Sequence, residues 1–245
     1  MKSFLSAISL LLLTACVIVP PKPEGFIAKE IRTSNNLSIS VWEKENILLD
    51  QTLRLYIEGD GDPNPSHLVA LDFAERDTNP NVIYIARPCQ WSNEPLCKQK
   101  PNIYGQDRFH TEIMSEMTEL ITYLMKKYHA TDVELIGYDG GAVVALNVAT
   151  KVPTKRVITI AGIVGLSSYN AYHNLPDTED AEDPEKNHFE LAKIPQIHYV
   201  GARDEITPRQ LAEYFVKKLD QPKSAVVKVV PDVNHVNWQG VRLDY

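Results

Sequence analysis

One stretch of the chain decides the fold: Val133-Glu134-Leu135-Ile136-Gly137-Tyr138-Asp139-Gly140-Gly141-Ala142. Val133 to Ile136 is a run typical of a buried strand, and Gly140 to Thr150 is rich in alanine and valine, as a buried helix is. Only a sharp turn separates the two, and Asp139 lies at its centre. Glycines flank the turn because a side chain at their positions would clash with the adjoining strand and helix. The stretch therefore predicts a strand, a tight turn that exposes Asp139, and a helix that begins at once.

Strands and helices alternate on both sides of this stretch. Several short β-rich runs and one long amphipathic helix precede it, and the alternation continues towards the end of the chain. The expected strands are Leu37–Val41, Arg54–Ile57, Val82–Ala86, Val157–Ala161, Ile197–Val200 and Val226–Val230, and the further helices are Phe109–His129 and Pro208–Leu219. Such an alternation predicts an α/β fold with a mainly parallel sheet and helices on both faces.

The segment 163–193 does not fit this alternation. It contains Tyr169 and Tyr172 and an acidic run from Asp177 to Glu185, but no sheet-like period. Because the insertion falls between two late strands, we expect a short lid over the carboxyl ends of the strands, with the two tyrosines in it. A solvated surface loop is the alternative for the acidic half.

A carboxylate and a histidine follow two of the later strands. Asp204 comes just after Ile197–Val200, and His235 lies in the loop after Val226–Val230. The carboxyl ends of parallel strands meet at one edge of a sheet, so both side chains are expected near Asp139. A histidine there can act as a general base, and a carboxylate can fix its tautomer and stabilise its charged form. Taken singly, Asp204 could be an acid at a helix N-terminus and His235 a surface residue.

This arrangement resembles the α/β-hydrolase superfamily over about Thr52 to Trp238. More closely, it resembles bacterial lipoprotein hydrolases whose turn reads Gly-Tyr-Ser-Gly-Gly. The motifs that carry the resemblance are Tyr56-Ile57-Glu58-Gly59-Asp60-Gly61, Ala86-Arg87-Pro88-Cys89-Gln90 and Val200-Gly201-Ala202-Arg203-Asp204. The resemblance implies that Asp139 holds the nucleophile position, Asp204 that of the acid and His235 that of the base. It implies no serine-esterase activity, since Asp139 replaces the serine.

The loop after Arg54–Ile57 is similar to the histidine-glycine loop of hydrolases, with Glu58 where histidine is common. That similarity implies an oxyanion hole formed by the backbone N–H groups of Asp60 and Gly140. A plain Gly-Asp turn is the alternative. A phosphate-binding loop is not expected around Asp139, because no Gly-Lys-Ser/Thr follows the glycines.

Three chemical roles are open to Asp139. As a nucleophile, as in haloalkane dehalogenases and epoxide hydrolases, it would form an alkyl-enzyme ester that His235 helps water to hydrolyse. Tyr169 and Tyr172 loosely resemble the tyrosines that protonate an opening epoxide. Alternatively, the site is catalytically silent and the protein binds a ligand or serves the envelope structurally. In the third role, Asp139 is a general base in an esterase-like hydrolase. The nucleophile role is the favoured prediction, and a small molecule is the expected substrate or ligand.

Residues 1–15 are expected to be a signal peptide. Its apolar run is too short to span a bilayer, and Leu13-Thr14-Ala15-Cys16 resembles the lipobox of bacterial lipoproteins. That resemblance implies cleavage before Cys16 and a lipid on its sulfur; ordinary secretion is the alternative. We then expect a lipidated tether over 16–36 and the hydrolase domain over 37–245. The predicted location is the bacterial envelope, anchored by lipid to the outer membrane and facing the periplasm.

The remaining cysteines and the overall charge narrow the chemistry further. Cys89 and Cys97 predict a disulfide, because an oxidising periplasm favours pairing and two thiols without a histidine cluster make a poor zinc site. The seven histidines are scattered, so no metal or organic cofactor is expected, and His198 is predicted to be a packed core residue. The net charge of −7 argues against nucleic acid as a partner.

Overall fold

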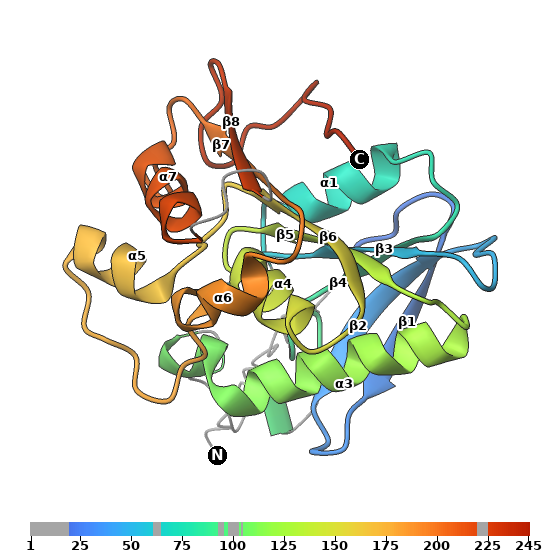
Figure 1. Ribbon diagram of the computed structural model, residues 1–245. Helices are drawn as coiled ribbons and strands as arrows, with labels where there is room; N and C mark the ends of the chain where they lie inside the picture. Colours follow the sequence, from blue (N-terminus) through green and yellow to red (C-terminus); the bar gives the residue numbers. More distant parts are fainter. Residues whose placement is uncertain (1–19, 61–64, 93–95, 98–102, 104, 220–224) are drawn as a thin grey trace, which may run out of the picture.

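The computed structural model describes residues 20–60, 65–92, 96–97, 103, 105–219 and 225–245 (Figure 1). An eight-stranded sheet runs through them in the order β1-β2-β4-β3-β5-β6-β7-β8. The first two strands pair antiparallel, and all pairings from β4 to β8 are parallel. This confirms the predicted α/β fold. The strands are β1 (Phe26–Arg32), β2 (Ser38–Lys44), β3 (Leu53–Ile57), β4 (Val82–Ile85), β5 (Val133–Tyr138), β6 (Thr154–Ile160), β7 (Gln196–Gly201) and β8 (Ala225–Val230).

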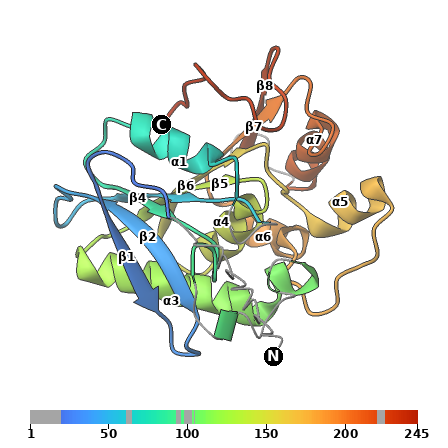
Figure 2. The same ribbon diagram turned by 180° about the vertical axis from the view of Figure 1, so that it is seen from behind.

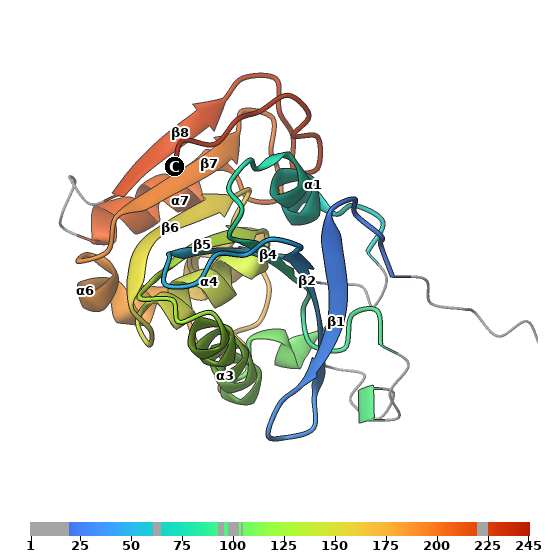
Figure 3. The same cartoon turned by 90° about the vertical axis from the view of Figure 1, so that its right-hand side faces the viewer.

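Helices cover both faces of the sheet (Figures 2 and 3). On one face α3 (Thr111–Lys127), α4 (Gly141–Ala149) and α7 (Arg209–Lys218) bury their apolar side chains in one core. On the other face α1 (Val69–Arg76) packs with the segment that follows β8, where Phe73 contacts Trp238. β3, β4 and β5 lie between these layers and are buried along their whole length, as central strands of a parallel sheet are.

The helix α3 forms where its apolar residues recur at three- and four-residue spacing. Its buried face includes Ile113, Met117 and Leu124, which pack into the core below the sheet. Lys126 and Lys127 lie in the last turn, where their charges complement the negative end of the helix dipole. The observed helix begins and ends two residues inside the predicted one, because Phe109 belongs to a separate 3-10 helix and His110 and Tyr128 cap α3.

The predicted tether over 16–36 is too long. β1 occupies Phe26–Arg32 and pairs along its whole length with β2. The folded chain reaches further still, because the Trp42 indole N–H donates to the Pro21 carbonyl at 2.9 Å. β1 is an edge strand whose side chains are mostly exposed, so no apolar alternation marks it in the sequence. Residues 1–15 and Cys16 lie outside the described residues.

The insertion over 163–193 contains α5 (Leu166–His173), η3 (Pro184–Asn187) and α6 (His188–Leu191). Part of its acidic half is built into the fold rather than solvated. Asp183 is buried and accepts hydrogen bonds from the backbone N–H groups of Leu166 and Ser167, which start α5. A carboxylate suits this position because the first N–H groups of a helix have no partner within the helix.

The structure contains the predicted disulfide between Cys89 and Cys97. His198 is fully buried in β7, where its Nδ1 lies 2.9 Å from the Thr159 hydroxyl, so it is a core residue as predicted. Within the described part of the chain, no helix has the length and apolar character needed to cross a membrane.

Candidate active site

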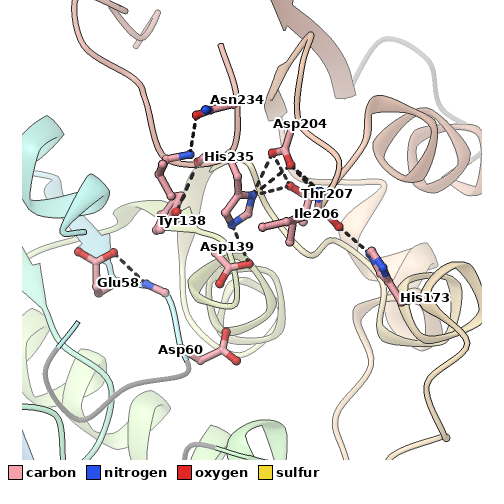
Figure 4. A network of polar contacts seen from close by, with 12 residues as sticks. Glu58, Asp60, Tyr138, Asp139, His173, Asp204, Ile206, Thr207, Asn234 and His235 are labelled. Atoms are coloured by element: carbon pink, nitrogen blue, oxygen red, sulfur yellow. Dashed lines mark hydrogen bonds and ion pairs between the residues drawn. The ribbon is translucent and has the colours of Figure 1, made fainter. Parts of the chain in front are cut away.

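The carboxyl ends of β3, β5, β7 and β8 bring the predicted site residues to one edge of the sheet (Figure 4). Asp60 follows β3, Asp139 follows β5, Asp204 follows β7 and His235 follows β8. The close-up shows His235 between the two carboxylates of Asp139 and Asp204. The spacing that the parallel sheet imposes therefore places together residues that are far apart in the sequence.

Asp139 is fixed in a left-handed backbone conformation with φ of 49°. Its N–H donates to the Ile160 carbonyl at 3.1 Å, and its own carbonyl accepts from Ala142 and Ile163 at 3.1 and 3.0 Å. A non-glycine residue with positive φ is uncommon, but aspartate tolerates it better than most. These bonds tie the turn to the neighbouring strand and to the start of α4, which leaves only the Asp139 side chain free to point into the site.

The glycines around Asp139 are required by close backbone contacts. A Cβ atom on Gly137 would come 2.4 Å from the Gly141 carbonyl oxygen. A Cβ atom on Gly141 would come 2.3 Å from the Ile57 carbonyl oxygen of the adjacent strand. Neither neighbour is a flexible side chain, so the sharp strand-turn-helix geometry predicted from the sequence depends on both glycines.

His235 bridges the two carboxylates through its two ring nitrogens. Its Nε2 lies 3.5 Å from Asp139 Oδ1, and its Nδ1 lies 3.0 Å from Asp204 Oδ2. Asp204 is itself held by the Ile206 and Thr207 N–H groups, which donate to its Oδ1 at 2.9 Å, and by the Thr207 hydroxyl, which donates to its Oδ2 at 2.8 Å. Asp204 thus fixes the tautomer and the orientation of the imidazole.

The two carboxylates favour the charged form of His235. Burial alone lowers the pKa of His235, but hydrogen bonds to Asp139 and Asp204 outweigh burial and raise this pKa to about 9. Burial likewise raises the pKa of Asp204, but hydrogen bonds from His235 and Thr207 outweigh it, so the net pKa is lowered. At neutral pH the imidazole is therefore an imidazolium between two carboxylates.

Buried polar groups hold the loop after β3 from both sides. Glu58 accepts from the Gly59 N–H at 3.0 Å, and the Gln90 side chain donates to the Gly59 carbonyl at 3.1 Å. The Gln90 side-chain oxygen accepts in turn from the Arg87 N–H at 2.8 Å. Burial raises the pKa of Glu58 to about 7. Glu58 and Gln90 therefore fix the peptide that precedes Asp60.

The Asp60 side chain lies beside the predicted oxyanion donors. A Cβ atom on Gly140 would come 1.4 Å from Asp60 Oδ1, so the carboxylate, not open space, covers Gly140. Asp60 Oδ2 lies 2.6 Å from Arg108 Nε. Burial and the nearby Asp139 charge raise the pKa of Asp60 to about 6, against the opposing effect of Arg87 and Arg108. An oxyanion at Gly140 would meet this group unless Asp60 were protonated or displaced.

A pocket of about 310 Å³ opens at Asp139 and His235. Tyr169 of α5 lines it, as the predicted lid requires, and so does Arg108. Tyr172 does not line this pocket, contrary to the prediction, and its side chain is 53% exposed and packs against the His173 ring. Among the described residues, no group of three histidine, cysteine, aspartate or glutamate side chains is placed to hold a metal ion.

Sequence reasoning did not predict a role for Arg87 or Arg108. Arg108 lies in the short 3-10 helix η2 (Gln106–Phe109), which has no periodic pattern, and Arg87 entered only as part of a motif. The sequence pointed to a role for these arginines only through their position. They lie between the strand predicted at Val82–Ala86 and the long helix, where loops approach the carboxyl edge of the sheet.

The fold and this arrangement of side chains define an α/β-hydrolase. Residues 87–241 match the family described as phospholipase/carboxylesterase, which is more than half of the chain. The chain belongs to this family. A comparison with curated protein sequences finds no significant match.

Solved structures with the same fold share little sequence with the chain. The esterase Pf2001 of Pyrococcus furiosus has a TM-score of 0.62 at 15% identity, covering 88% of this chain and 85% of that one. TT1662 of Thermus thermophilus has a TM-score of 0.55 at 18% identity, covering 86% of this chain and 90% of that one. XC6422 of Xanthomonas campestris, an α/β serine hydrolase without a lid, has 0.55 at 14%, covering 89% of each chain. At these identities the likeness establishes the fold alone.

Proposed function

We propose that the protein is a hydrolase whose nucleophile is the Asp139 carboxylate, acting on an epoxide-like or haloalkane-like small molecule. One observation carries the proposal: Asp139 lies at the elbow position, 3.5 Å from His235 Nε2, with Asp204 on the other ring nitrogen. A carboxylate that attacks a saturated carbon forms a stable ester, whereas attack on an ordinary ester would give an anhydride with little driving force.

The reaction has two steps, and water is the only reactant besides the substrate. An Asp139 oxygen attacks the saturated carbon, and the carbon–oxygen bond of the epoxide or the carbon–halogen bond breaks. Tyr169 in the pocket wall supports proton delivery to an epoxide oxygen. His235 then takes a proton from water, and the resulting hydroxide attacks the carboxyl carbon of Asp139. The alcohol leaves with that proton, and a carboxylic acid remains on Asp139. Its proton returns to Tyr169 after epoxide opening, or passes to solvent to balance the released halide, and the carboxylate is restored.

The charges of the site suit this sequence of steps. In the free protein the hydrogen bond that Asp139 accepts from His235 contributes to raising the pKa of His235 to about 9, so the imidazole starts as an imidazolium. Ester formation removes the Asp139 charge, and the pKa of His235 then falls because one of its two carboxylate partners is neutral. His235 therefore becomes a neutral base at the step that needs one.

Isotope labelling tests the nucleophile. After a single turnover in heavy-oxygen water with styrene oxide, bromobutane or sodium glycidate, we expect the label in the Asp139 carboxylate by peptide mass spectrometry. A His235→Gln variant is expected to accumulate the ester as a mass increase on the same peptide, and Asp139→Asn to lose it. Asp50→Asn is the control, because Asp50 is exposed and faces His129, which follows α3 outside the loops that carry the site. Absence of label and adduct across the panel would overturn the proposal.

A catalytically silent binding protein is the second candidate, and the position of Asp60 favours it. Its carboxylate covers Gly140, one of the two predicted oxyanion donors. Asp139→Ser separates the two candidates, because it restores a hydroxyl nucleophile beside His235. Hydrolysis of p-nitrophenyl acetate by that variant, lost again in Asp139→Ser/Asp204→Asn, supports an intact catalytic frame. No activity in the folded variant supports a silent site.

We also propose that the chain is a lipid-anchored envelope protein, as the Cys16 motif predicts. The disulfide between Cys89 and Cys97 supports export, because such bonds persist in oxidising compartments. Expression with labelled palmitate is expected to label the wild type and not Cys16→Ala, with the label in the outer-membrane fraction. Label retained in Cys16→Ala would contradict the anchor site.

A further inference from the structure

Two arginines face one carboxylate at the wall of the pocket. Arg108 lines the pocket and contacts Asp60, and Arg87 lies behind it with its Nη2 donating to the Arg108 carbonyl at 2.5 Å. Both guanidinium groups lie over the Phe109 ring, at 5.4 Å for Arg87 and 4.9 Å for Arg108. The aromatic ring and the backbone bond hold the two positive charges side by side, against their mutual repulsion.

The hydrogen bonds of this cluster are incomplete within the described chain. Arg87 is only 3% exposed, yet its Nε and Nη1 have no hydrogen-bond partner. Asp60 Oδ1 is also buried without one. Buried polar atoms are nearly always paired, because an unpaired one loses its hydrogen bonds to water without replacement. The cluster thus has spare donors on Arg87 and a spare acceptor on Asp60.

We propose that Arg108, backed by Arg87, binds a carboxylate group of the substrate, and that Asp60 occupies this subsite in the free protein. The inference rests on the proposed function and names its substrate class: small carboxylic acids that carry the reactive epoxide or halide. A substrate carboxylate in the place of Asp60 accepts from the planar guanidinium of Arg108 in the geometry that arginine favours.

The position of the subsite suits the chemistry at Asp139. Asp60 Oδ1 lies against Gly140, the residue that directly follows Asp139. An anionic group held at this place therefore lies one residue from the attacking carboxylate. The pocket of about 310 Å³ is at the lower end of small-molecule sites, which excludes long chains. Both features favour a short acid with its reactive carbon near its carboxylate.

Protonation of Asp60 removes its negative charge and so frees Arg108 to bind the carboxylate of a substrate. The groups that face Asp60 are Asp139 from the elbow, Arg87 from the end of β4, Arg108 from η2, and the phenols of Tyr138 and Tyr169. Burial and Asp139 raise the pKa of Asp60 to about 6. Below this pH the neutral side chain releases Arg108, so the binding of an anion is expected to strengthen as the pH falls and to take up a proton.

Calorimetry with two unreactive probes tests the subsite on the wild-type protein. Phenylacetate and phenylacetamide have the same shape and differ in charge. We expect phenylacetate to bind more tightly, with proton uptake at about pH 7.5 measured in buffers of different ionisation enthalpy. Arg108→Gln is expected to weaken phenylacetate at least about tenfold, since a charged hydrogen-bonded pair is lost. Asp60→Asn is expected to tighten it about tenfold at this pH and to abolish the proton uptake.

Three controls complete the design. Arg209→Gln removes an exposed arginine on α7 and is expected to leave both affinities unchanged. Arg108→Lys keeps the charge and is expected to retain part of the binding, should Arg108→Gln fail to fold. Equal binding of the two probes, or no effect of Asp60→Asn, would overturn the subsite.

The outcome is separate from that of the labelling experiment. Selective phenylacetate binding without label in Asp139 leaves the subsite standing and removes the nucleophile. Label in Asp139 without selective binding removes the subsite and leaves the nucleophile.

Discussion

His235 is the residue on which the electrostatics of the site converge. It lies between Asp139 and Asp204 with a contact from each ring nitrogen, and its side chain is largely buried. Two carboxylate partners stabilise the imidazolium form of His235. His235 can therefore act as a base only when one of these carboxylates loses its charge during the reaction. The protonation state of His235 is therefore a direct report on the state of Asp139.

Asp139→Asn is expected to lower the pKa of His235 from about 9 towards its ordinary range, because one of two anionic partners becomes neutral. Titration of the imidazole carbon-bound proton by NMR measures the change. Asp50→Asn removes an exposed carboxylate that faces His129 outside the loops of the site, and it is expected to leave the titration unchanged. An unaltered His235 pKa in Asp139→Asn would mean that the two side chains do not interact in solution.

The sequence predicted the backbone positions of the site better than its side-chain orientations. Asp139, Asp204 and His235 follow strands of one parallel sheet, so their proximity depends on topology alone. Asp60 was expected to contribute its N–H, and the loop does place it at the elbow. Its carboxylate position depends on the Arg108 contact, which joins a loop and a 3-10 helix far apart in the sequence. No periodic pattern records such a contact.

At the amino end of the sheet, a buried ionic cluster joins β3 to its neighbours. Arg54 of β3 pairs with Asp77 after α1 at 2.9 Å and with Glu134 of β5 at 2.7 Å. The Tyr245 ring covers its guanidinium at 3.7 Å. Burial lowers the pKa of Arg54, but the bonds to Asp77 and Glu134 outweigh burial and raise it. One arginine thus joins two buried carboxylates from different elements, Asp77 after α1 and Glu134 of β5.

Arg54→Ala is expected to lower the free energy of unfolding by about 3–5 kcal/mol, because Asp77 and Glu134 lose their shared partner. Urea denaturation followed by circular dichroism measures this. Arg209→Ala, which removes an exposed pair with Glu213 on α7, is the matched control and is expected to cost less than about 0.5 kcal/mol. A similar small effect for both variants would show that the buried cluster contributes little.

Elements with a clear apolar period were predictable, and those without one were not. β3, β5 and α3 bury continuous or regularly spaced apolar residues. β1 lies at the edge of the sheet with exposed side chains, so its strand state depends on pairing with β2. The start of α7 was also misplaced by one residue: Pro208 precedes the helix, which begins at Arg209, while Thr207 bonds to Asp204.

The disulfide between Cys89 and Cys97 lies next to Gln90, which holds the loop that carries Asp60. Cys89 has φ of 68°, and the next residue is Gln90, which holds the Gly59 carbonyl. Cys89→Ser/Cys97→Ser is expected to lower stability by about 2–3 kcal/mol, the closure entropy of a short loop. It is also expected to weaken phenylacetate binding, because the loop that carries Asp60 loses a fixed partner. Thermal unfolding and calorimetry measure the two effects, and unchanged binding would separate the disulfide from the site.

For the whole molecule, three buried groups make stability depend on pH in the same direction. Their folded-state pKa values are raised, to about 6 for Asp60, about 7 for Glu58 and about 9 for His235. A raised pKa stabilises the folded state below the unfolded pKa, and this stabilisation is lost as pH rises through the folded value. Asp204, with a lowered pKa, acts oppositely and only in acid. Burial lowers the pKa of His198 to about 4, so His198 also acts oppositely, between that pH and the ordinary pKa of a histidine.

The midpoint of thermal unfolding is therefore expected to fall between about pH 5 and about pH 9, with the fall below about pH 6.5 reduced by the opposing effect of His198. Differential scanning calorimetry across this range measures it. Glu58→Gln is expected to flatten the decrease below about pH 7 and to leave the decrease above it, where His235 loses its proton. A midpoint that rises with pH between these limits would contradict the assigned shifts.

The fold could be predicted from the sequence because every strand but the first is recognisable from its apolar and β-branched residues. The parallel order then fixed which ends of the strands meet. The sequence pattern could not predict which charged side chains pair between loops. Such pairs depend on the detailed conformation of each loop, which has no periodic pattern.

The disulfide beside Gln90 has a consequence for the life of the protein in the cell. Before export the two cysteines are expected to stay reduced, and the loop that carries Asp60 would lack one of its supports. Under the proposed export, the site would reach its full binding strength only after oxidation outside the cytoplasm. This order of maturation would limit the proposed activity on small organic acids inside the cell that makes the protein.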